Sequence, residues 1–313
     1  CDIREATMKD PKVRQIVLPL ITALIWGSAF VTQSLGAAHM GCFSFSALRS
    51  IPAAISLFLL LLIMQRVRPR GKYSAGEKRA LLRGGLVCGI FLTLGVNLQQ
   101  LGIETTSAGK AGFITALYIV LVPVFSIALG KKAKKAIWLC VLIALAGLYF
   151  LCFDGGGDMS FNRGDFCIFL CAFAFSAQIL AVDHYVQQVD GIALSCAQFV
   201  VTTVLSGIGA LIAGEQTTLA SIQTCLPYLL YVGVVSSGVG YTLQILAQKD
   251  GDPTVVSLLL SLESFFAVVS GAIVLNERMS LREYIGCALM LAAVILSQLP
   301  EKKGKAVESK GKA

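Results

Sequence analysis

The stretch PTVVSLLLSLESFFAVVSGAIVL, residues 253–275, decides the fold class of this chain. It is long and apolar enough to cross a bilayer, because roughly 20 apolar residues span the hydrocarbon as a helix. Glu263 lies near its middle, where a carboxylate costs about 2.5–3.5 kcal/mol on insertion scales. On a helical wheel, mostly small and hydroxyl-bearing residues share the half of Glu263. This predicts a membrane helix with a polar face towards a packed or hydrated interior.

Composition extends this prediction to the whole chain. Of its 313 residues, 56% are hydrophobic and 14% are charged, whereas about one quarter of a soluble domain is charged. The long apolar runs of the sequence show no alternating strand pattern, and only helices and closed barrels satisfy the hydrogen bonds of the backbone in lipid. The sequence therefore predicts an all-α polytopic membrane protein. Its ten transmembrane helices are expected at residues 16–35, 43–64, 81–101, 107–129, 136–153, 165–182, 192–213, 226–247, 253–275 and 284–299.

The basic residues indicate how the chain lies in the membrane. Nearly all Lys and Arg residues fall on one side of the predicted helices. They lie within residues 4–14, 66–83, 131–135 and 302–312, together with Lys249. Lys and Arg favour cytoplasmic loops, so we expect a multi-pass protein of the cell membrane with both termini in the cytoplasm. The net charge of +8 then reflects orientation. No nucleic-acid partner is expected, because the basic residues form no face of a soluble domain.

The cysteines and the chain ends carry little chemistry. Most of the ten cysteines lie inside apolar runs, without CxxC or zinc-site spacing, so we interpret them as packing residues. Residues 1–7 precede Met8-Lys9-Asp10, an ordinary start, which suggests an upstream extension. We expect segment 1–15 to be cytoplasmic, and the Lys/Gly-rich tail 300–313 to be a disordered cytoplasmic segment.

The second half of the chain repeats the first at an offset of 145 residues. The matches are Gly95–Gln99 with Gly240–Gln244, Leu117 with Leu262, Tyr118 with Glu263 and, at a slightly different offset, Ala47–Arg49 with Cys196–Gln198. Five helices per half would insert the halves in opposite directions, a construction of secondary transporters with a site at the repeat interface. We therefore predict two inverted five-helix repeats, 16–153 and 165–299, joined by an external linker, 154–164.

Polar residues at membrane depth are the candidate functional groups. Glu263 is a functional candidate by default; the alternative is a structural carboxylate hydrogen-bonded to Ser or Tyr. Arg49 suits either an anionic solute group or a structural partner at a helix end. The buried amides suit either hydrogen bonds between helices or contacts with a solute. The expected cavity residues are Trp26, Asn97, Thr115, Tyr118, Gln178, Tyr241, Gln244, Glu263 and Ser264.

Enzyme signatures are missing from the sequence. There is no HExxH, Walker A, GxGxxG or GxSxG motif, and no TVGYG channel filter. The only two histidines, His39 and His184, are expected on opposite sides of the membrane. We therefore expect no enzyme, no cofactor and no metal.

Several motifs, in order, resemble one known group. They are WGSAF (26–30), LR (48–49), TSAGKAGF (106–113), LY (117–118), LE (262–263) and LNE (275–277). Over residues 16–299 the chain resembles the EamA-type permeases of the drug/metabolite transporter superfamily. The resemblance implies ten helices in two repeated domains and alternating access around a central cavity near Trp26, Tyr118 and Glu263. It also implies Glu277 at the external end of the ninth helix. The family often has proline where Ile119 and Ser264 stand here.

These observations predict a secondary exporter or exchanger of a small metabolite, amino acid or drug-like solute. Protonation of Glu263 would couple transport to a proton gradient; alternatively, Glu263 binds an amine in uniport or exchange. The rival interpretation is a non-transporting membrane protein, an assembly or sensory partner. The expected partners are a small-molecule substrate and the lipid bilayer, and a homodimer is left open.

Overall fold

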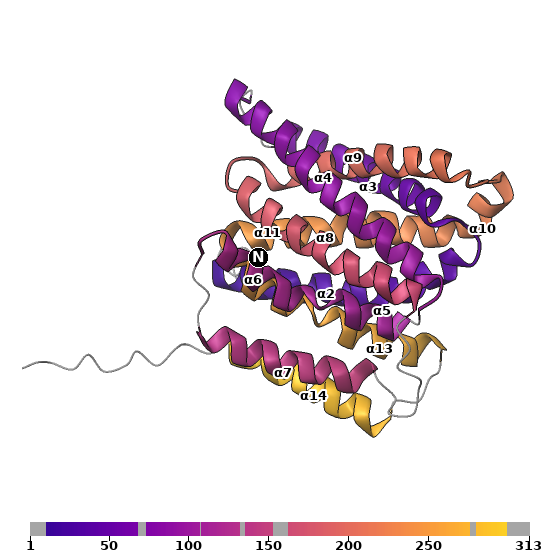
Figure 1. The fold of residues 1–313 in the computed structure, drawn as a ribbon. Helices are drawn as coiled ribbons and strands as arrows, with labels where there is room; N and C mark the ends of the chain where they lie inside the picture. The colour runs from indigo at the N-terminus through magenta and orange to yellow at the C-terminus, as the bar shows by residue number, and fades with distance from the viewer. Residues whose placement is uncertain are drawn as a thin grey trace, which may run out of the picture.

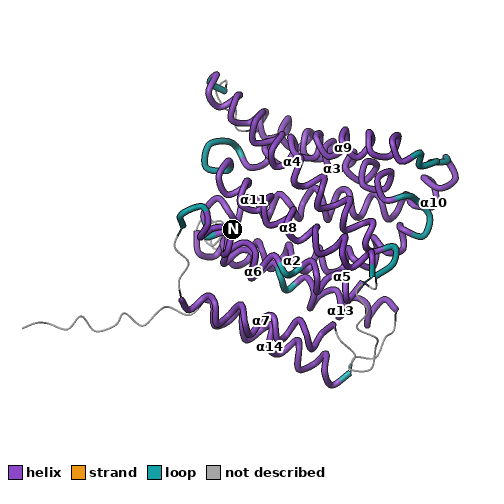
Figure 2. Tube along the Cα trace, in the orientation of Figure 1, coloured by secondary structure: helices purple, strands orange, loops and turns teal. Residues whose placement is uncertain are grey.

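The computed structural model describes residues 11–67, 73–106, 108–131, 135–152, 162–275 and 280–298. Within these ranges every regular element is a helix, as the composition predicted (Figure 2). Residues 1–10, most of the 154–164 linker, Glu277 and the 300–313 tail lie outside the described residues. The expectations for these segments therefore stay predictions.

The helices follow the predicted spans in order (Figure 1). The first half holds α2 (Pro11–Ala37), α3 (Cys42–Val67), α4 (Ala75–Ile103), α5 (Ala108–Thr115), α6 (Tyr118–Ala128) and α7 (Lys135–Cys152). The second half holds α8 (Arg163–Tyr185), α9 (Gly191–Ala213), α10 (Leu219–Leu230), the π-helix η1 (Tyr231–Gly240), α11 (Tyr241–Asp250), α12 (Pro253–Leu260), α13 (Glu263–Leu275) and α14 (Leu281–Gln298). In the described part, eight spans are long and apolar enough to cross a membrane, and Ile137–Gly147 and Tyr284–Leu296 are shorter apolar helices. The chain is a multi-pass helical membrane protein.

Local capping explains why several helices extend past their apolar runs. The Ser74 hydroxyl accepts a hydrogen bond from the Glu77 amide, and the Glu77 carboxylate accepts one from the Ser74 amide. This capping box starts α4 six residues before the predicted boundary at residue 81. Asn162 and Asp165 form a second capping box, which starts α8 two residues before the predicted boundary at residue 165. Hydropathy alone does not register such polar starts.

The two halves pack as an inverted repeat. Helix α3 lies against its counterpart α9, and α7 against its counterpart α14, the latter pair at the lower edge of Figure 1. The contact of α4 with α8 is matched by that of α11 and η1 with α2. The contact of α12 and α13 with α2 is matched by that of α5 and α6 with α8. Exchanging the halves thus preserves the set of helix neighbours.

Two spans that the sequence predicts as single helices are interrupted in the structure. The helix at 107–129 breaks at Ala116–Leu117, and the helix at 253–275 breaks at Ser261–Leu262, 145 residues further on. At each break the backbone forms a hydrogen bond that spans three residues, as in a 3₁₀ turn. These bonds run from the Leu117 amide to the Ile114 carbonyl (3.2 Å) and from the Leu262 amide to the Leu259 carbonyl (3.3 Å). Tyr118 and Glu263 are therefore the first residues of the helices that follow.

The stretch of residues 253–275 is more deeply buried than the polar face around Glu263 requires. Leu258, Leu259 and Leu260 have no exposed surface, and Leu262 is 1% exposed. Ile273, near the other end of the span, is 73% exposed. The first part of this span therefore lies among other helices on all sides, while its end presents apolar surface suited to lipid.

Candidate functional site

A pocket lies in the middle of the bundle where both halves meet. It holds about 490 Å³ of space between protein atoms, a volume that includes open solvent at its mouth. Its wall comes from both halves of the repeat. The lining residues are Trp26, Phe30, Gln33, Arg49, Gln99, Thr115, Tyr118, Phe175, Gln178, Ile179, Ser236, Tyr241, Gln244 and Glu263.

The two helix breaks bring Tyr118 and Glu263 together. The Tyr118 hydroxyl donates a hydrogen bond to Glu263 Oε1 at 3.0 Å. Both side chains are buried, with 2% and 3% of their surfaces exposed. A hydrogen bond to a carboxylate is stronger than one between neutral groups, particularly where water is excluded. The pair therefore holds the carboxylate at a fixed place on the pocket wall.

Arg49 brings a cation to the same wall from α3. Its Nη1 donates to Gln33 Oε1 at 2.8 Å, and the side chain is 4% exposed. Among the described residues no ion pair joins Arg49 to Glu263. Gly233 lets η1 pass close to α3 here, because a Cβ at that position would lie 2.5 Å from the Arg49 carbonyl oxygen. The pocket wall thus carries a guanidinium group and a carboxyl group that form no ion pair with each other.

Amide side chains form a chain across the second half. Gln244 Nε2 donates to Gln178 Oε1 at 3.2 Å, and Gln178 Nε2 donates to Gln198 Oε1 at 3.2 Å. Gln244 and Gln178 line the pocket, whereas Gln198 lies behind them. In the first half, Gln99 Nε2 instead donates to Thr115 Oγ1 at 3.3 Å. Amides therefore supply much of the polar surface.

Trp26 and Tyr241 form an aromatic part of the wall. Their ring centroids are 4.6 Å apart, and Trp26 Nε1 donates to the Ser236 carbonyl at 3.1 Å. Ser236 belongs to the π-helix η1, whereas α4, the counterpart in the first half, is a regular α-helix. Short π-helical segments are frequent at functional sites.

The pocket wall is largely built from repeat mates. Four pairs of lining residues are each separated by 145 positions: Phe30 and Phe175, Gln33 and Gln178, Gln99 and Gln244, Tyr118 and Glu263. The last two pairs belong to the matches noted in the sequence. The first two fall in FVTQ (30–33) and FSAQ (175–178), a short match at the same offset that sequence reasoning missed.

Most of the expected cavity residues lie on this wall. Seven of the nine do so, and their contact with a solute stays a prediction. Asn97 instead donates to Ser206 Oγ of α9 at 2.8 Å, and Ser264 to the Gly112 carbonyl of α5 at 2.9 Å. Both therefore join helices outside the pocket wall. The lining residues with no earlier expectation are Gln33, Phe175, Ile179 and Ser236.

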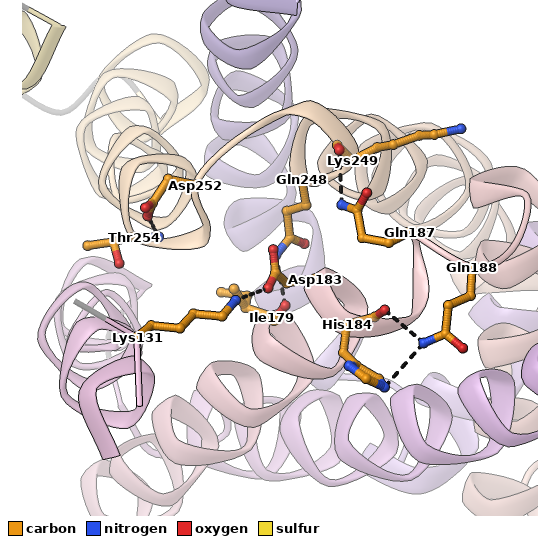
Figure 3. A network of polar contacts seen from close by, with 10 residues as sticks. All are labelled: Lys131, Ile179, Asp183, His184, Gln187, Gln188, Gln248, Lys249, Asp252 and Thr254. Carbon is orange, nitrogen blue, oxygen red and sulfur yellow. Dashed lines mark hydrogen bonds and ion pairs between the residues drawn. The ribbon is translucent and has the colours of Figure 1, made fainter. Parts of the chain in front are cut away.

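A polar layer joins the helices at one end of the bundle, beyond the pocket (Figure 3). Lys131, after α6, forms an ion pair with Asp183 of α8. Gln248 Nε2 of α11 donates to the Ile179 carbonyl of α8 at 2.8 Å. Gln187 Nε2 donates to the Lys249 carbonyl at 3.0 Å. Because Ile179 lines the pocket, these contacts fasten its wall at this end.

The fold and the pocket define the class: a helical membrane protein of two repeats around a central polar pocket. A family model described as the EamA-like transporter family matches residues 14–153 and 162–299. The chain belongs to this family, as the motifs indicated. Several relatives of the chain are named as transporters or, in one case, as an exporter.

Named relatives agree with this membership, and a solved structure agrees with the fold. An uncharacterized transporter of Archaeoglobus fulgidus is 32% identical, over 89% of this chain and 84% of the relative. The threonine/homoserine exporter RhtA of Escherichia coli is 26% identical, over 92% of each chain. The inner membrane transporter YedA of E. coli, also uncharacterized, is 23% identical over 92% of this chain and 93% of that one. A crystal structure with 16% identity matches the fold with a TM-score of 0.73, covering 91% of this chain and 96% of the other.

Proposed function

We propose that this protein is a secondary carrier that moves a small zwitterionic solute of the amino-acid class by alternating access. The observation that carries the proposal is the presence of Arg49 and Glu263 on one pocket wall without an ion pair between them. Arg49 binds the carboxylate of the solute and Glu263 binds its ammonium group. The carrier needs no cofactor or metal and is not an enzyme.

Charge burial supports this assignment. A buried charge without a counter-charge is costly, and a zwitterion supplies one partner to each of these two residues. An amine alone or an acid alone supplies only one. The named activity of RhtA, export of threonine and homoserine, agrees with a solute of this kind.

Competition at Glu263 couples the solute to protons. A carboxylate that holds a proton carries no charge to attract an ammonium group, so Glu263 binds one or the other. Tyr118 hydrogen-bonds the same carboxylate and keeps it in place through the exchange. Export of one solute then accompanies entry of one proton as the two repeats rock around the pocket.

The polar layer beyond the pocket marks the cytoplasmic end. Lys131, Lys249, Arg66 and Lys78 lie in the loops and helix ends that belong to this side of the predicted topology. An excess of Lys and Arg favours the cytoplasmic face. Both termini then lie in the cytoplasm, with the protein in the cell membrane.

Ligand-induced thermal stabilisation of the detergent-solubilised protein tests the charge requirement. The probes are L-threonine, 1-amino-2-propanol, which lacks the carboxylate, and 3-hydroxybutyrate, which lacks the ammonium group. Only a bound solute raises the melting temperature by mass action. We expect threonine alone to do so, and Arg49→Gln and Glu263→Gln each to abolish the shift.

Arg66→Gln is the matched control, since Arg66 is an exposed residue near the end of the same helix α3. It is expected to keep the shift. Equal shifts with the amine or the acid alone would contradict the zwitterion assignment. No shift with any of the common L-amino acids would instead favour the non-transporting assembly or sensory partner.

A further inference from the structure

We propose that Gln244 is a specificity-determining residue, whose side-chain oxygen accepts a hydrogen bond from a donor on the solute's side chain. Gln178 and Gln198 act as positioning residues that fix its amide. The favoured solute is then an amino acid with a hydroxyl or amide group beyond its two charged groups. This inference rests on the proposed function and names the solute class more closely.

The amide of Gln244 is held from one side only. Its nitrogen donates to Gln178, whose own nitrogen donates to Gln198. All three side chains are buried, none with more than 1% of its surface exposed. The chain of amides ends at Gln198 Nε2, which has no partner among the described residues, so the orientation of Gln244 depends on Gln178 and Gln198 together.

The oxygen of the same amide has no partner. Gln244 Oε1 is shielded from solvent and accepts no hydrogen bond from the described residues. A buried acceptor without a donor is unfavourable and calls for an explanation. The oxygens of Gln100 and Gln248 are also unpartnered, but these residues lie off the pocket wall. Gln244 belongs to the wall, so a solute in the pocket can supply the missing donor.

The repeat shows what is particular to this position. Gln33 and Gln178 are repeat mates; Gln33 is held by Arg49, and Gln178 is held by Gln198 at the position matching Arg49. The second half thus repeats the contact of the first without its charge and with the opposite hydrogen-bond direction, since Gln33 Oε1 accepts from Arg49 whereas Gln178 Nε2 donates to Gln198. With Arg49 and Glu263 assigned to the charged groups, Gln244 faces the remainder of the solute with a neutral acceptor.

The chemistry of an amide oxygen then sets the selectivity. A hydroxyl or amide N–H on the solute satisfies it. An aliphatic side chain of similar size leaves it without a donor. Sites built to hydrogen-bond a hydroxyl discriminate strongly against the analogue that lacks it.

Binding of L-homoserine and of L-2-aminobutyrate, which differ only by the terminal hydroxyl, tests this inference by thermal shift titration of the purified full chain. We expect the wild type to bind homoserine about tenfold or more tightly. Gln244→Leu is expected to bring the ratio of the two affinities close to one. Gln198→Leu is expected to lower the ratio while leaving the affinity for 2-aminobutyrate unchanged, which a general loss of structure would not do.

Asn97→Leu is the control, because Asn97 is a buried amide of α4 that lies off the pocket wall and whose oxygen also has no partner among the described residues. It should keep the wild-type ratio. Equal binding of both solutes by the wild type, or an unchanged ratio in both Gln244→Leu and Gln198→Leu, would overturn the inference while the proposed function stands. Binding of neither solute, nor of any other amino acid, would overturn the proposed function and this inference with it. If Gln244→Leu does not fold, Gln198→Leu decides.

Discussion

At the scale of single residues, the pocket presents a guanidinium group and a carboxyl group from different helices. Glu263 is fixed by Tyr118, and Arg49 by Gln33. Neither partner carries a counter-charge, so each group keeps the capacity to pair with a charged group of a solute. This arrangement suits transient binding better than a permanent buried ion pair would, because a closed pair leaves little attraction for a solute.

A second carboxyl group, at the opposite end from the polar layer, gives a prediction about pH and stability. Glu104 follows the last residue of α4. Partial burial raises the pKa of its carboxyl, and the negative charge of the nearby Glu215 raises this pKa further by a smaller amount. A raised pKa means that the folded protein binds this proton more tightly than the unfolded chain. Ionisation of Glu104 therefore destabilises the fold as the pH rises through the raised pKa.

Replacing this carboxyl removes the cost of ionisation. We expect Glu104→Gln to melt at a higher temperature than the wild type at pH 8. The gain should shrink as the pH falls below the raised pKa, where the wild-type carboxyl is protonated. Thermal unfolding followed from pH 4 to pH 8 measures this. A gain that grows towards low pH would contradict the assignment.

At the scale of elements, the paired breaks could not be foreseen from local composition. Neither Ala116–Leu117 nor Ser261–Leu262 contains proline or glycine, the usual signals of an interrupted helix. In the second half, Ser257 and Ser261 hydroxyls bond the carbonyls of Thr254 and Leu258, which bends membrane helices. Serines are too common for that effect to be predicted from one sequence.

Some features of the fold follow from the pattern of the sequence, whereas others depend on how the helices pack. Hydropathy predicted the spans, and the 145-residue repeat matched Tyr118 with Glu263, whereas the hydrogen bond between these two residues is seen only in the structure. The π-helix of residues 231–240 arises where η1 packs against α2 and α3, so it depends on tertiary contacts. Asn97 faces α9 instead of the pocket for a similar reason. Side-chain direction at a helix interface is not encoded in residue type.

The close approach of α2 to α13 gives a prediction about packing. A Cβ on Gly27 would lie 2.5 Å from Phe266 Cβ and 2.6 Å from the Glu263 carbonyl oxygen. Gly27→Ala should therefore push α13 away, destabilise the protein by about 1–3 kcal/mol and weaken binding at Glu263. Thermal unfolding with and without solute measures both effects.

Gly207, within α9, is the matched control because nothing lies within 4 Å of a Cβ placed there. Gly207→Ala should stabilise the helix by about 0.5–1 kcal/mol and leave binding unchanged. Equal effects of the two substitutions would show that the contact of α2 with α13 is unimportant.

At the scale of the whole molecule, the inverted repeat predicts a definite topology. A fluorescent protein fused to the C-terminus should be bright in a bacterial host, since it folds in the cytoplasm. Alkaline phosphatase fused after Gly214, in the turn that follows α9, should be active because the predicted topology places that turn outside the cytoplasm. An active phosphatase at the C-terminus would reverse the orientation and exchange the roles of the two ends.

In the proposed function, Glu263 exchanges a solute for a proton. The direct measurement is uptake of labelled L-threonine into proteoliposomes with an acidic interior, from which protons flow outwards. The account predicts accumulation that follows the size of the pH gradient in the wild type and is lost in Glu263→Gln. Accumulation that ignores the gradient and is unchanged in Glu263→Gln would contradict it.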